Sequence, residues 1–311
     1  MSVAIAYITV IVLWGTTPLA VQWSAQGIDM VFALCLRTLI GLIMTGGWMY
    51  WRGERISLEP AALKLYAVSL LGGVGAMSAI YWSSRYIASG LISVLFGLAP
   101  IIGGIFASLW LSERFLHIRR IAGVVCALAG LVIIFHQELN LGGESWKGVL
   151  GAFTGVVLYS LSTVWIKRLG GQYSVLSVNA GSLLASFTVL FLVWLAGGGE
   201  WPAQTSSRNL AAILYLGVFG SFIGFVSYYY VLRRLRTSTT LLVTLVTPVI
   251  ALGLGWVLNG ERLHQGVWLG CALVMAGLLV YLWRAVSRTL SGIWIRNRGF
   301  RVSDSVRPES E

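Results

Sequence analysis

The sequence predicts an all-α integral membrane protein with about ten transmembrane helices, arranged as two inverted five-helix repeats. Composition gives the first indication, because 57% of the 311 residues are hydrophobic and only 11% are charged, whereas charged residues make up about 25% of a soluble domain. The charged residues also gather in short clusters, and the apolar runs between them are long enough to cross a bilayer. A duplicated pattern of residues is the third observation.

The apolar runs are about 17 to 25 residues long, which is the length that crosses the hydrocarbon core as a helix. We expect helices because every backbone polar group inside a bilayer must find its partner without water. A membrane β-barrel would instead show alternating segments of about ten residues, and this pattern is missing. The first run lacks the positive region of a cleavable signal peptide, so we expect it to be a helix of the mature protein. The expected spans lie at roughly 3–23, 30–50, 63–84, 88–111, 118–136, 146–166, 175–196, 209–231, 237–258 and 264–284.

The basic residues predict how the helices are oriented. The net charge is +11, and the 22 lysines and arginines are spread unevenly over the connections. Seventeen lie on one set of alternating connections and four on the opposite set, with Arg37 inside a span. Since lysine and arginine mark the cytoplasmic side, we expect a multi-pass protein of the cell inner membrane with both termini in the cytoplasm. The positive charge therefore indicates topology in a lipid bilayer, and no nucleic-acid partner is expected.

Two parts of the chain carry the same pattern of residues. Pro100 corresponds to Pro248 and Glu113 to Glu261, in both cases at an offset of 148 positions. The first helix of the chain shows a second correspondence, at an offset of 145. The segments that match are LAPIIGGIFASLWLSERFLH with VTPVIALGLGWVLNGERLH, and LWGTTPLAVQ with LYSLSTVWIK.

This duplication divides the chain into a first repeat at residues 1–140, a second repeat at 141–284 and a basic cytoplasmic tail at 285–311. Each repeat has five spans, and a unit with an odd number of crossings ends on the opposite side of the membrane. Its copy must therefore insert upside down. Inverted repeats provide two nearly equivalent arrangements, one open to each side, with a binding site near the midplane. The pattern indicates a transporter that works by alternating access.

These features resemble the drug/metabolite transporter (DMT) superfamily and, within it, the EamA-type family. The resemblance rests on the two sets of five spans, on Trp14-Gly15 in the first helix and on the duplicated proline and Glu-Arg signatures, and it covers residues 1 to about 284. It implies a substrate cavity between helices 1–4 and 6–9, with helices 5 and 10 at the flanks. It also implies export of amino acids and related small metabolites.

Polar residues interrupt the first helix. Trp14 and Thr17 are three positions apart and hence share one helical face, and Pro18 follows directly. A proline kinks a membrane helix and is tolerated where hydroxyls, neighbours or a water-filled cavity satisfy the freed backbone groups. We expect a bent, cavity-facing helix that offers a hydroxyl and an indole to the substrate. In the alternative, Thr16 or Thr17 bonds backward to a carbonyl at the kink, and both interpretations can hold at once.

Arg37 is the single charged residue deep in an expected span. An isolated charge there is costly, so such residues usually face a protein interior or a cavity. A guanidinium binds a carboxylate through two hydrogen bonds, which favours amino acids or other organic anions as substrates. Two alternatives stay open, because Arg37 could bond the carbonyls of a broken neighbouring helix or reach the membrane interface. The second repeat offers Asn179 and Ser182 near the corresponding place.

Other polar and aromatic residues complete the expected substrate site. They are candidates because their helices belong to the core group in the family that the sequence resembles. Together they would line a mostly neutral, amphipathic pocket, although packing alone explains each of them equally well. These candidates are Ser78, Tyr81, Tyr159, Ser162, Thr163, Asn179 and Tyr228.

Prolines and glutamates are the expected gating elements. Pro18, Pro100 and Pro248 would bend their helices during a rocking motion between the halves, or else they hold static kinks. Glu113 and Glu261 lie at helix ends beside arginines, so we expect boundary ion pairs or gates rather than proton carriers. No aspartate or glutamate falls inside an expected span. The energy source is therefore open, and facilitated efflux down a gradient is one option.

We therefore expect a transporter that exports small metabolites, above all amino acids or related compounds. Efflux of cationic or lipophilic drugs is the alternative, and the lack of an embedded carboxylate counts against it. We expect no enzymatic activity, cofactor or metal, since Cys35, Cys126 and Cys271 have no catalytic or metal-binding spacing and suit packing. A homodimer through helices 5 and 10 would use their glycines, but internal packing explains these equally well.

Overall fold

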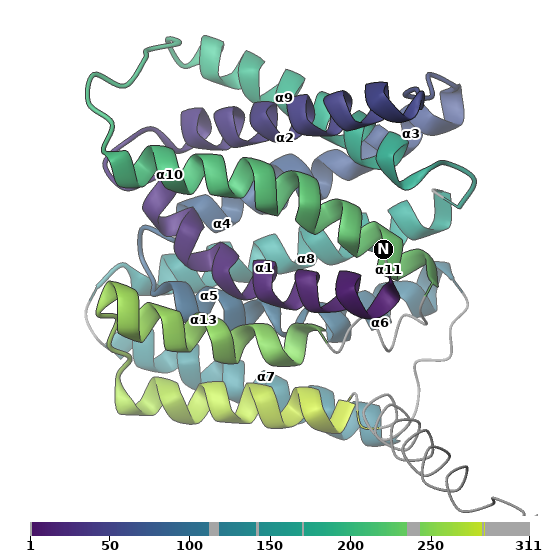
Figure 1. Ribbon diagram of the computed structural model, residues 1–311. Coiled ribbons are helices and arrows are strands. Elements are labelled where there is room, and N and C mark those ends of the chain that lie inside the picture. The colour runs from purple at the N-terminus through teal and green to yellow at the C-terminus, as the bar shows by residue number, and fades with distance from the viewer. Residues whose placement is uncertain are drawn as a thin grey trace, which may run out of the picture.

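The structure is a bundle of long helices (Figure 1). Every regular element in the described part of the chain is a helix, which confirms the all-α membrane fold. Seven helices are long and apolar enough to cross a membrane, and three more apolar helices are shorter; together they match the ten expected spans. The expected tail at 285–311 lies outside the described residues. The computed structural model describes residues 2–111, 118–140, 143–169, 171–234, 243–281 and 283.

The first five spans follow the expected order, with two departures from regular helices. The third span contains a π-helical stretch with the sequence LGGVGA between its α-helical parts. The fourth span is broken into two helices at Gly97 and Leu98. The elements of this half are α1 (Val3–Ser24), α2 (Met30–Arg52), α3 (Pro60–Leu70), η1 (Leu71–Ala76), α4 (Met77–Ser83), α5 (Ser89–Phe96), α6 (Ala99–Trp110) and α7 (Ile118–Asn140).

The second half of the chain contributes the other five spans. Their third member again contains a π-helical stretch, with the glycine-rich sequence LGVFGSFIG. Such stretches are rare in helices and occur frequently at functional sites. The elements of this half are α8 (Ser145–Leu169), α9 (Val175–Ala196), α10 (Ser207–Tyr215), η2 (Leu216–Gly224), α11 (Phe225–Arg234), α13 (Val243–Asn259) and a last helix, Gln265–Tyr281.

The helices end at two opposite faces of the bundle, which we name after residues of α2. At the Asp29 end, the Asp29 carboxylate accepts a hydrogen bond of 2.8 Å from the N–H of Phe32 and caps α2. At the Arg52 end, Gly53 adopts a left-handed φ of 66° and ends the same helix. Because the spans alternate in direction, the connections 25–29, 84–88, 197–206 and 260–264 lie at the Asp29 end, and 53–59 and 171–174 lie at the Arg52 end.

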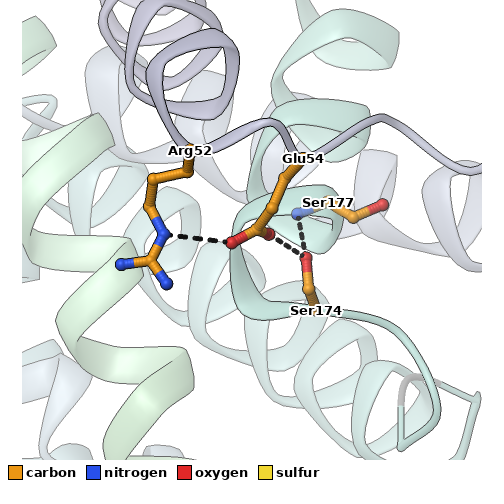
Figure 2. A network of polar contacts seen from close by, with 4 residues as sticks. All are labelled: Arg52, Glu54, Ser174 and Ser177. Atoms are coloured by element: carbon orange, nitrogen blue, oxygen red, sulfur yellow. Dashed lines mark hydrogen bonds and ion pairs between the residues drawn. The ribbon is translucent and has the colours of Figure 1, made fainter.

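Polar contacts at the Arg52 end join the two halves of the chain (Figure 2). Arg52 Nε forms an ion pair of 3.3 Å with Glu54 Oε1, and the Ser174 hydroxyl donates a hydrogen bond of 2.7 Å to Glu54 Oε2. Ser174 in turn accepts a hydrogen bond of 3.1 Å from the N–H of Ser177 and caps α9. The turn after α2 therefore holds the start of α9, and these two helices pack side by side along one edge of the bundle (Figure 1).

The first helix of each half packs against the other half. Contacts of α1 reach α10, η2, α11 and α13, whereas contacts of α8 reach α3, η1, α4, α5 and α6. Each of the two helices thus lies against the third and fourth spans of the opposite half. Glycine and proline lie at these contacts, since Gly15 and Pro18 of α1 and Gly151 and Gly155 of α8 are buried. The polar middle of both helices is thereby placed inside the bundle.

The helix α7 and the last helix form a close pair at the edge opposite α2 and α9 (Figure 1). A Cβ atom on Gly123 would lie 2.6 Å from the carbonyl oxygen of Gly277, and one on Gly130 would lie 2.6 Å from that of Gly270. Glycine permits such close approach of helix backbones. We call these four residues the glycine clasp. They serve packing within one chain, which is the alternative that the sequence left beside a homodimer.

The clasp predicts that Gly277→Ala destabilises the protein. The new Cβ would lie 2.5 Å from the backbone nitrogen of Ala127, so the helices would have to separate. We expect the apparent unfolding temperature in detergent to fall by roughly 3 to 10 °C. Gly253→Ala on α13 is the matched control, because its Cβ would meet nothing within 4 Å and alanine favours a helix. If both variants lowered the unfolding temperature equally, the close contact between α7 and the last helix would not be needed for stability.

Candidate functional site

Three hollows follow one another through the bundle from the Asp29 end to the Arg52 end. The first, which we call the vestibule, lies at the Asp29 end and has a volume of about 490 Å³. It lies between the ends of α1 and α13 and the connection after α4. Its lining residues are Gln22, Ala25, Gln26, Gly27, Ile28, Ser84, Arg85 and Asn259.

The central cavity comes next and has a volume of about 100 Å³. It is enclosed by α1, α2, α4, α5, α6, α8, η2, α11 and α13, so both halves of the chain contribute to its wall. Most of the lining is apolar or aromatic, with a few hydroxyl groups and one guanidinium. The lining residues are Trp14, Thr17, Pro18, Val21, Arg37, Met77, Ile80, Ile92, Ser93, Phe96, Ala99, Tyr159, Gly220, Phe225 and Thr247.

The third hollow, the serine-rich cavity, lies towards the Arg52 end and has a volume of about 60 Å³. Four serines, two glycines and an asparagine make its wall more polar than that of the central cavity. Tyr159 and Phe225 line both cavities. The lining residues are Ser69, Gly72, Gly73, Tyr159, Ser162, Thr163, Ile166, Asn179, Ser182, Leu183, Ser186, Phe225, Tyr228, Tyr229 and Leu232.

Arg37 brings the only charge among the described residues that line the central cavity. It is 3% exposed, and its Nε and Nη2 donate long hydrogen bonds of 3.4 Å to the Ser221 hydroxyl. The guanidinium lies over the ring of Tyr81, 5.9 Å from its centroid. In the described part of the chain, Nη1 has no hydrogen-bond partner and no carboxylate lies within ion-pair distance. A buried guanidinium normally has acceptors for its protons, so this one can bind an anion.

The π-helical stretch η2 positions the guanidinium. Gly217 lies against α2, where an added Cβ would be 3.0 Å from the carbonyl oxygen of Arg37. One turn later, Gly220 lines the cavity beside Nη2 of Arg37, and Ser221 offers its hydroxyl. Asn179 of α9 donates a hydrogen bond of 3.2 Å to the carbonyl oxygen of Ser221. Arg37 of α2 and Asn179 of α9 therefore both bind Ser221 in η2.

Aromatic rings separate the central cavity from the serine-rich cavity. The ring centroid of Trp14 lies 4.7 Å from that of Tyr228 and 6.1 Å from that of Tyr159. Phe225 is 6.3 Å from Trp14, and Phe96 is 5.6 Å from Tyr159. We call these five rings the aromatic partition. Since they come from α1, α5, α8 and α11, both halves of the chain form it.

Side-chain amides close the central cavity towards the vestibule. Asn259 Nδ2 donates hydrogen bonds to Gln22 Oε1 at 3.0 Å and to Glu261 Oε1 at 2.9 Å. Asn259 Oδ1 accepts one of 3.0 Å from the indole N–H of Trp23. Glu261 Oε2 accepts one of 3.3 Å from the N–H of Gly90 in the first turn of α5, where the helix dipole favours a carboxylate. This amide closure joins α1, α5 and the end of α13.

Most residues predicted for the substrate site line one of the two inner cavities. The two groups are separated by the aromatic partition, to which Trp14, Tyr159 and Tyr228 themselves belong. Their roles in binding stay predictions. Trp14, Thr17, Arg37 and Tyr159 line the central cavity, and Tyr159, Ser162, Thr163, Asn179 and Tyr228 line the serine-rich cavity.

Ser78 and Tyr81 line neither of the two inner cavities, and their roles in binding stay predictions. Tyr81 is fully buried, and its hydroxyl accepts a hydrogen bond of 3.2 Å from Ser24. Its ring supports the guanidinium of Arg37 from behind. Ser78 is the second residue of α4, which begins directly after η1. Ser78 was a candidate because its helix belongs to the core group of the resembled family, which does not determine the helix face.

The threonines of α1 fit both interpretations of the polar interruption. The Thr17 hydroxyl donates a hydrogen bond of 2.6 Å to the Leu13 carbonyl and also lines the central cavity. Thr16 donates to the same carbonyl at 2.9 Å and shares a hydrogen bond of 2.6 Å with the Tyr215 hydroxyl. Pro18 lies inside α1 and lines the central cavity. The turn before Pro18 therefore combines backbone bonding with a cavity-facing surface.

The predicted gating residues have different surroundings. Pro100 stands in the first turn of α6, directly after the break of the fourth span, where proline is well tolerated. Pro248 lies inside α13. Glu261 forms no ion pair with Arg262 among the described residues, so the expected boundary ion pair is replaced by the hydrogen bonds of the amide closure. Glu113 lies outside the described residues.

Several lining residues were not predicted from the sequence. Ser93 and Phe96 lie three positions apart on α5 and line the central cavity, and Ser186 of α9 lines the serine-rich cavity. The spacing of Ser93 and Phe96 places them on one helical face, which is a signal that the sequence contains. Ser221 stands in the glycine-rich stretch LGVFGSFIG. The recurrence of glycine-rich stretches in the third span of each half was a second usable signal.

Comparisons with known proteins agree with this architecture. The model of the EamA-like transporter family matches residues 1–136 and 146–283. The uncharacterized transporter YoaV of Bacillus subtilis is 25% identical over 286 residues, which are 90% of this chain and 96% of YoaV. Protein PagO of Salmonella typhimurium is 27% identical over 82% of this chain and 84% of PagO. The uncharacterized inner membrane transporter YedA of Escherichia coli is 24% identical over 86% of this chain and 87% of YedA.

A solved crystal structure has the same fold, with a TM-score of 0.67 at 21% sequence identity over 90% of this chain and 97% of that chain. The helical bundle, its membrane-length spans and the family match define a multi-pass membrane transporter. The chain belongs to the EamA-like transporter family.

Proposed function

We propose that this transporter exports small metabolites that carry a carboxylate, amino acids or related compounds, by alternating access. The observation that carries the proposal is the unpartnered Nη1 of Arg37 in the central cavity. A carboxylate would give the guanidinium charge-assisted hydrogen bonds in a bidentate arrangement. The apolar and aromatic wall would enclose the rest of the substrate.

Two barriers support an alternating mechanism. The amide closure lies on the vestibule side of the central cavity, and the aromatic partition lies on the other side. We propose that the two repeats, 1–140 and 141–284, rock against each other so that the barriers open in turn. Helices would bend at Pro18, Pro100 and Pro248 and at the π-helical stretches. We propose that Glu113 and Glu261 are gating residues, as the duplicated pattern predicts.

The orientation in the membrane follows from the charges at the two ends. We propose that the Arg52 end faces the cytoplasm, with both termini there, in the cell inner membrane, because cytoplasmic connections are rich in lysine and arginine. YedA, one of the relatives, is an inner membrane transporter. The described basic residues at the Arg52 end include Arg52, Arg55, Lys64, Arg119, Lys167, Arg168, Arg233 and Arg234, whereas those at the Asp29 end are Arg85, Lys147, Arg208 and Arg262.

Efflux of cationic drugs, the alternative, has less support. A cation in the central cavity would meet the positive charge of Arg37 and none of the carboxylates of the described residues. The aromatic partition could hold a cation over its rings, but several of these rings already pack on one another.

Counterflow in proteoliposomes tests the proposed function. Liposomes that contain the full-length protein are preloaded with an unlabelled compound, and uptake of the radiolabelled form is followed for a panel of amino acids, their N-acetyl and 2-oxo relatives and a cationic dye. We expect uptake of at least one carboxylate to exceed uptake into protein-free liposomes several-fold. Uptake of the dye alone would favour the alternative. No uptake of any carboxylate by protein that is monodisperse in detergent would contradict the proposal.

A further inference from the structure

We propose that the transported species is a monoanion, with one carboxylate, an apolar body and no ammonium group, and that the membrane potential drives its export. This inference rests on the proposed function and narrows it. It concerns the charge of the substrate. We infer this charge from the charged groups that line the central cavity.

The central cavity holds one fixed positive charge. The guanidinium of Arg37 carries this charge, it is buried, and its Nη1 has no partner among the described residues. One carboxylate neutralises this charge completely. A zwitterion would bring a second positive charge into the same enclosed space, where charges interact much more strongly than in water.

An ammonium group would find no balancing carboxylate there. None of the residues that line the central cavity is acidic. The carboxylates of the neighbouring connections are engaged at the two ends of the bundle: Asp29 caps α2, Glu54 pairs with Arg52, and Glu261 belongs to the amide closure. Reaching the cavity would require each of them to give up these partners.

The remaining polar groups of the wall are hydroxyls of Thr17, Ser93, Tyr159 and Thr247. They can accept a hydrogen bond, but they carry no charge, and the Thr17 hydroxyl already donates to the Leu13 carbonyl. The rest of the wall is aliphatic or aromatic. This surface suits the apolar body of an organic acid, such as a branched or aromatic side chain.

The same charges predict electrogenic transport. The cavity wall contains no carboxylate that could carry a proton in the opposite direction, and the charge of Arg37 returns with the protein at the end of each cycle. Each cycle therefore moves one negative charge across the membrane. An inside-negative potential pushes that charge outward and would support a gradient of about 50-fold per 100 mV. Export would then need no coupling ion.

The test compares three compounds that share the same aromatic side chain and differ in their charged groups. Proteoliposomes with the full-length protein receive a tenfold inward potassium gradient with valinomycin, which makes the interior positive. Radiolabelled phenylpyruvate, L-phenylalanine and L-phenylalanine amide are the anion, the zwitterion and the cation. We expect phenylpyruvate to accumulate about tenfold above its level without valinomycin, and the other two to stay near the level of protein-free liposomes. The pair 4-methyl-2-oxopentanoate and L-leucine repeats the comparison with a smaller body.

The possible failures are distinguishable. Transport of L-phenylalanine or L-leucine in preference to its 2-oxo acid would contradict the proposal that the substrate is a monoanion. It would not contradict the proposed export of carboxylates. Transport of a 2-oxo acid without a response to the potential would overturn the electrogenic step. If no carboxylate of these pairs or of the wider counterflow panel is carried, the proposed function itself fails.

Discussion

Replacing Arg37 with glutamine is expected to lower carboxylate transport on the order of 100-fold or more, because a hydrogen bond to a charged group contributes about 1.5–3 kcal/mol and two are lost. The measurement is the initial rate of counterflow in proteoliposomes at equal protein content. Arg37→Lys keeps the charge but loses the planar fork of donors, so we expect it to retain part of the activity.

Thermal unfolding separates a binding role of Arg37 from a structural one. Its hydrogen bonds to Ser221 are long, at 3.4 Å, and Nη1 has no partner among the described residues. Removing this buried charge should therefore leave the apparent Tm in detergent unchanged or raise it, while a bound carboxylate should raise the Tm of the unsubstituted protein only. Arg55→Gln is the control, since Arg55 is exposed at the Arg52 end. A Tm that falls together with transport would contradict the binding role.

Asn259→Ala is expected to open the central cavity towards the vestibule. The substitution removes the hydrogen bonds of Asn259 to Gln22, Trp23 and Glu261, each contributing about 1 kcal/mol. Val21→Cys is a suitable reporter, because Val21 lines the central cavity and the next residue lines the vestibule. We expect its labelling by a membrane-impermeant maleimide to accelerate on the order of tenfold or more.

The labelling experiment starts from a protein in which Cys35, Cys126 and Cys271 are replaced, since all three are free thiols. Gln172→Ala is the matched control, because it removes an amide hydrogen bond of 2.8 Å to Tyr173 at the opposite end of the bundle. It should leave the labelling rate unchanged. If Asn259→Ala labels no faster than its parent, the amide closure does not act as a barrier.

The fold could be predicted because its signals repeat along the chain. Apolar runs of membrane length and basic clusters at alternate connections need no knowledge of tertiary contacts. The polar interruption at Trp14, Thr17 and Pro18 was visible for the same reason, since polarity inside a span usually faces a cavity or a protein neighbour. All three residues line the central cavity.

The surroundings of Arg37 could not be predicted in the same way. Its burial depends on Gly217 and Gly220 of η2, which are far away in the sequence and let α2 approach. Ser78 was a candidate because its helix belongs to the core group of the family, and this does not show which face of the helix lines a cavity. The hydrogen bonds of Glu261 likewise depend on Asn259 and on the first turn of α5, whereas its neighbour Arg262 suggested an ion pair.

The glycine clasp has a consequence for the rocking motion that we propose. Gly123 and Gly277 meet backbone to backbone, so α7 and the last helix cannot slide past each other without a steric clash. These two helices belong to different halves of the chain. The rocking motion that we propose would therefore use the line between these two helices as its hinge. In such a motion the largest displacement would fall on the opposite edge, where α2 and α9 pack together and Glu54 accepts a hydrogen bond from Ser174 (Figure 1).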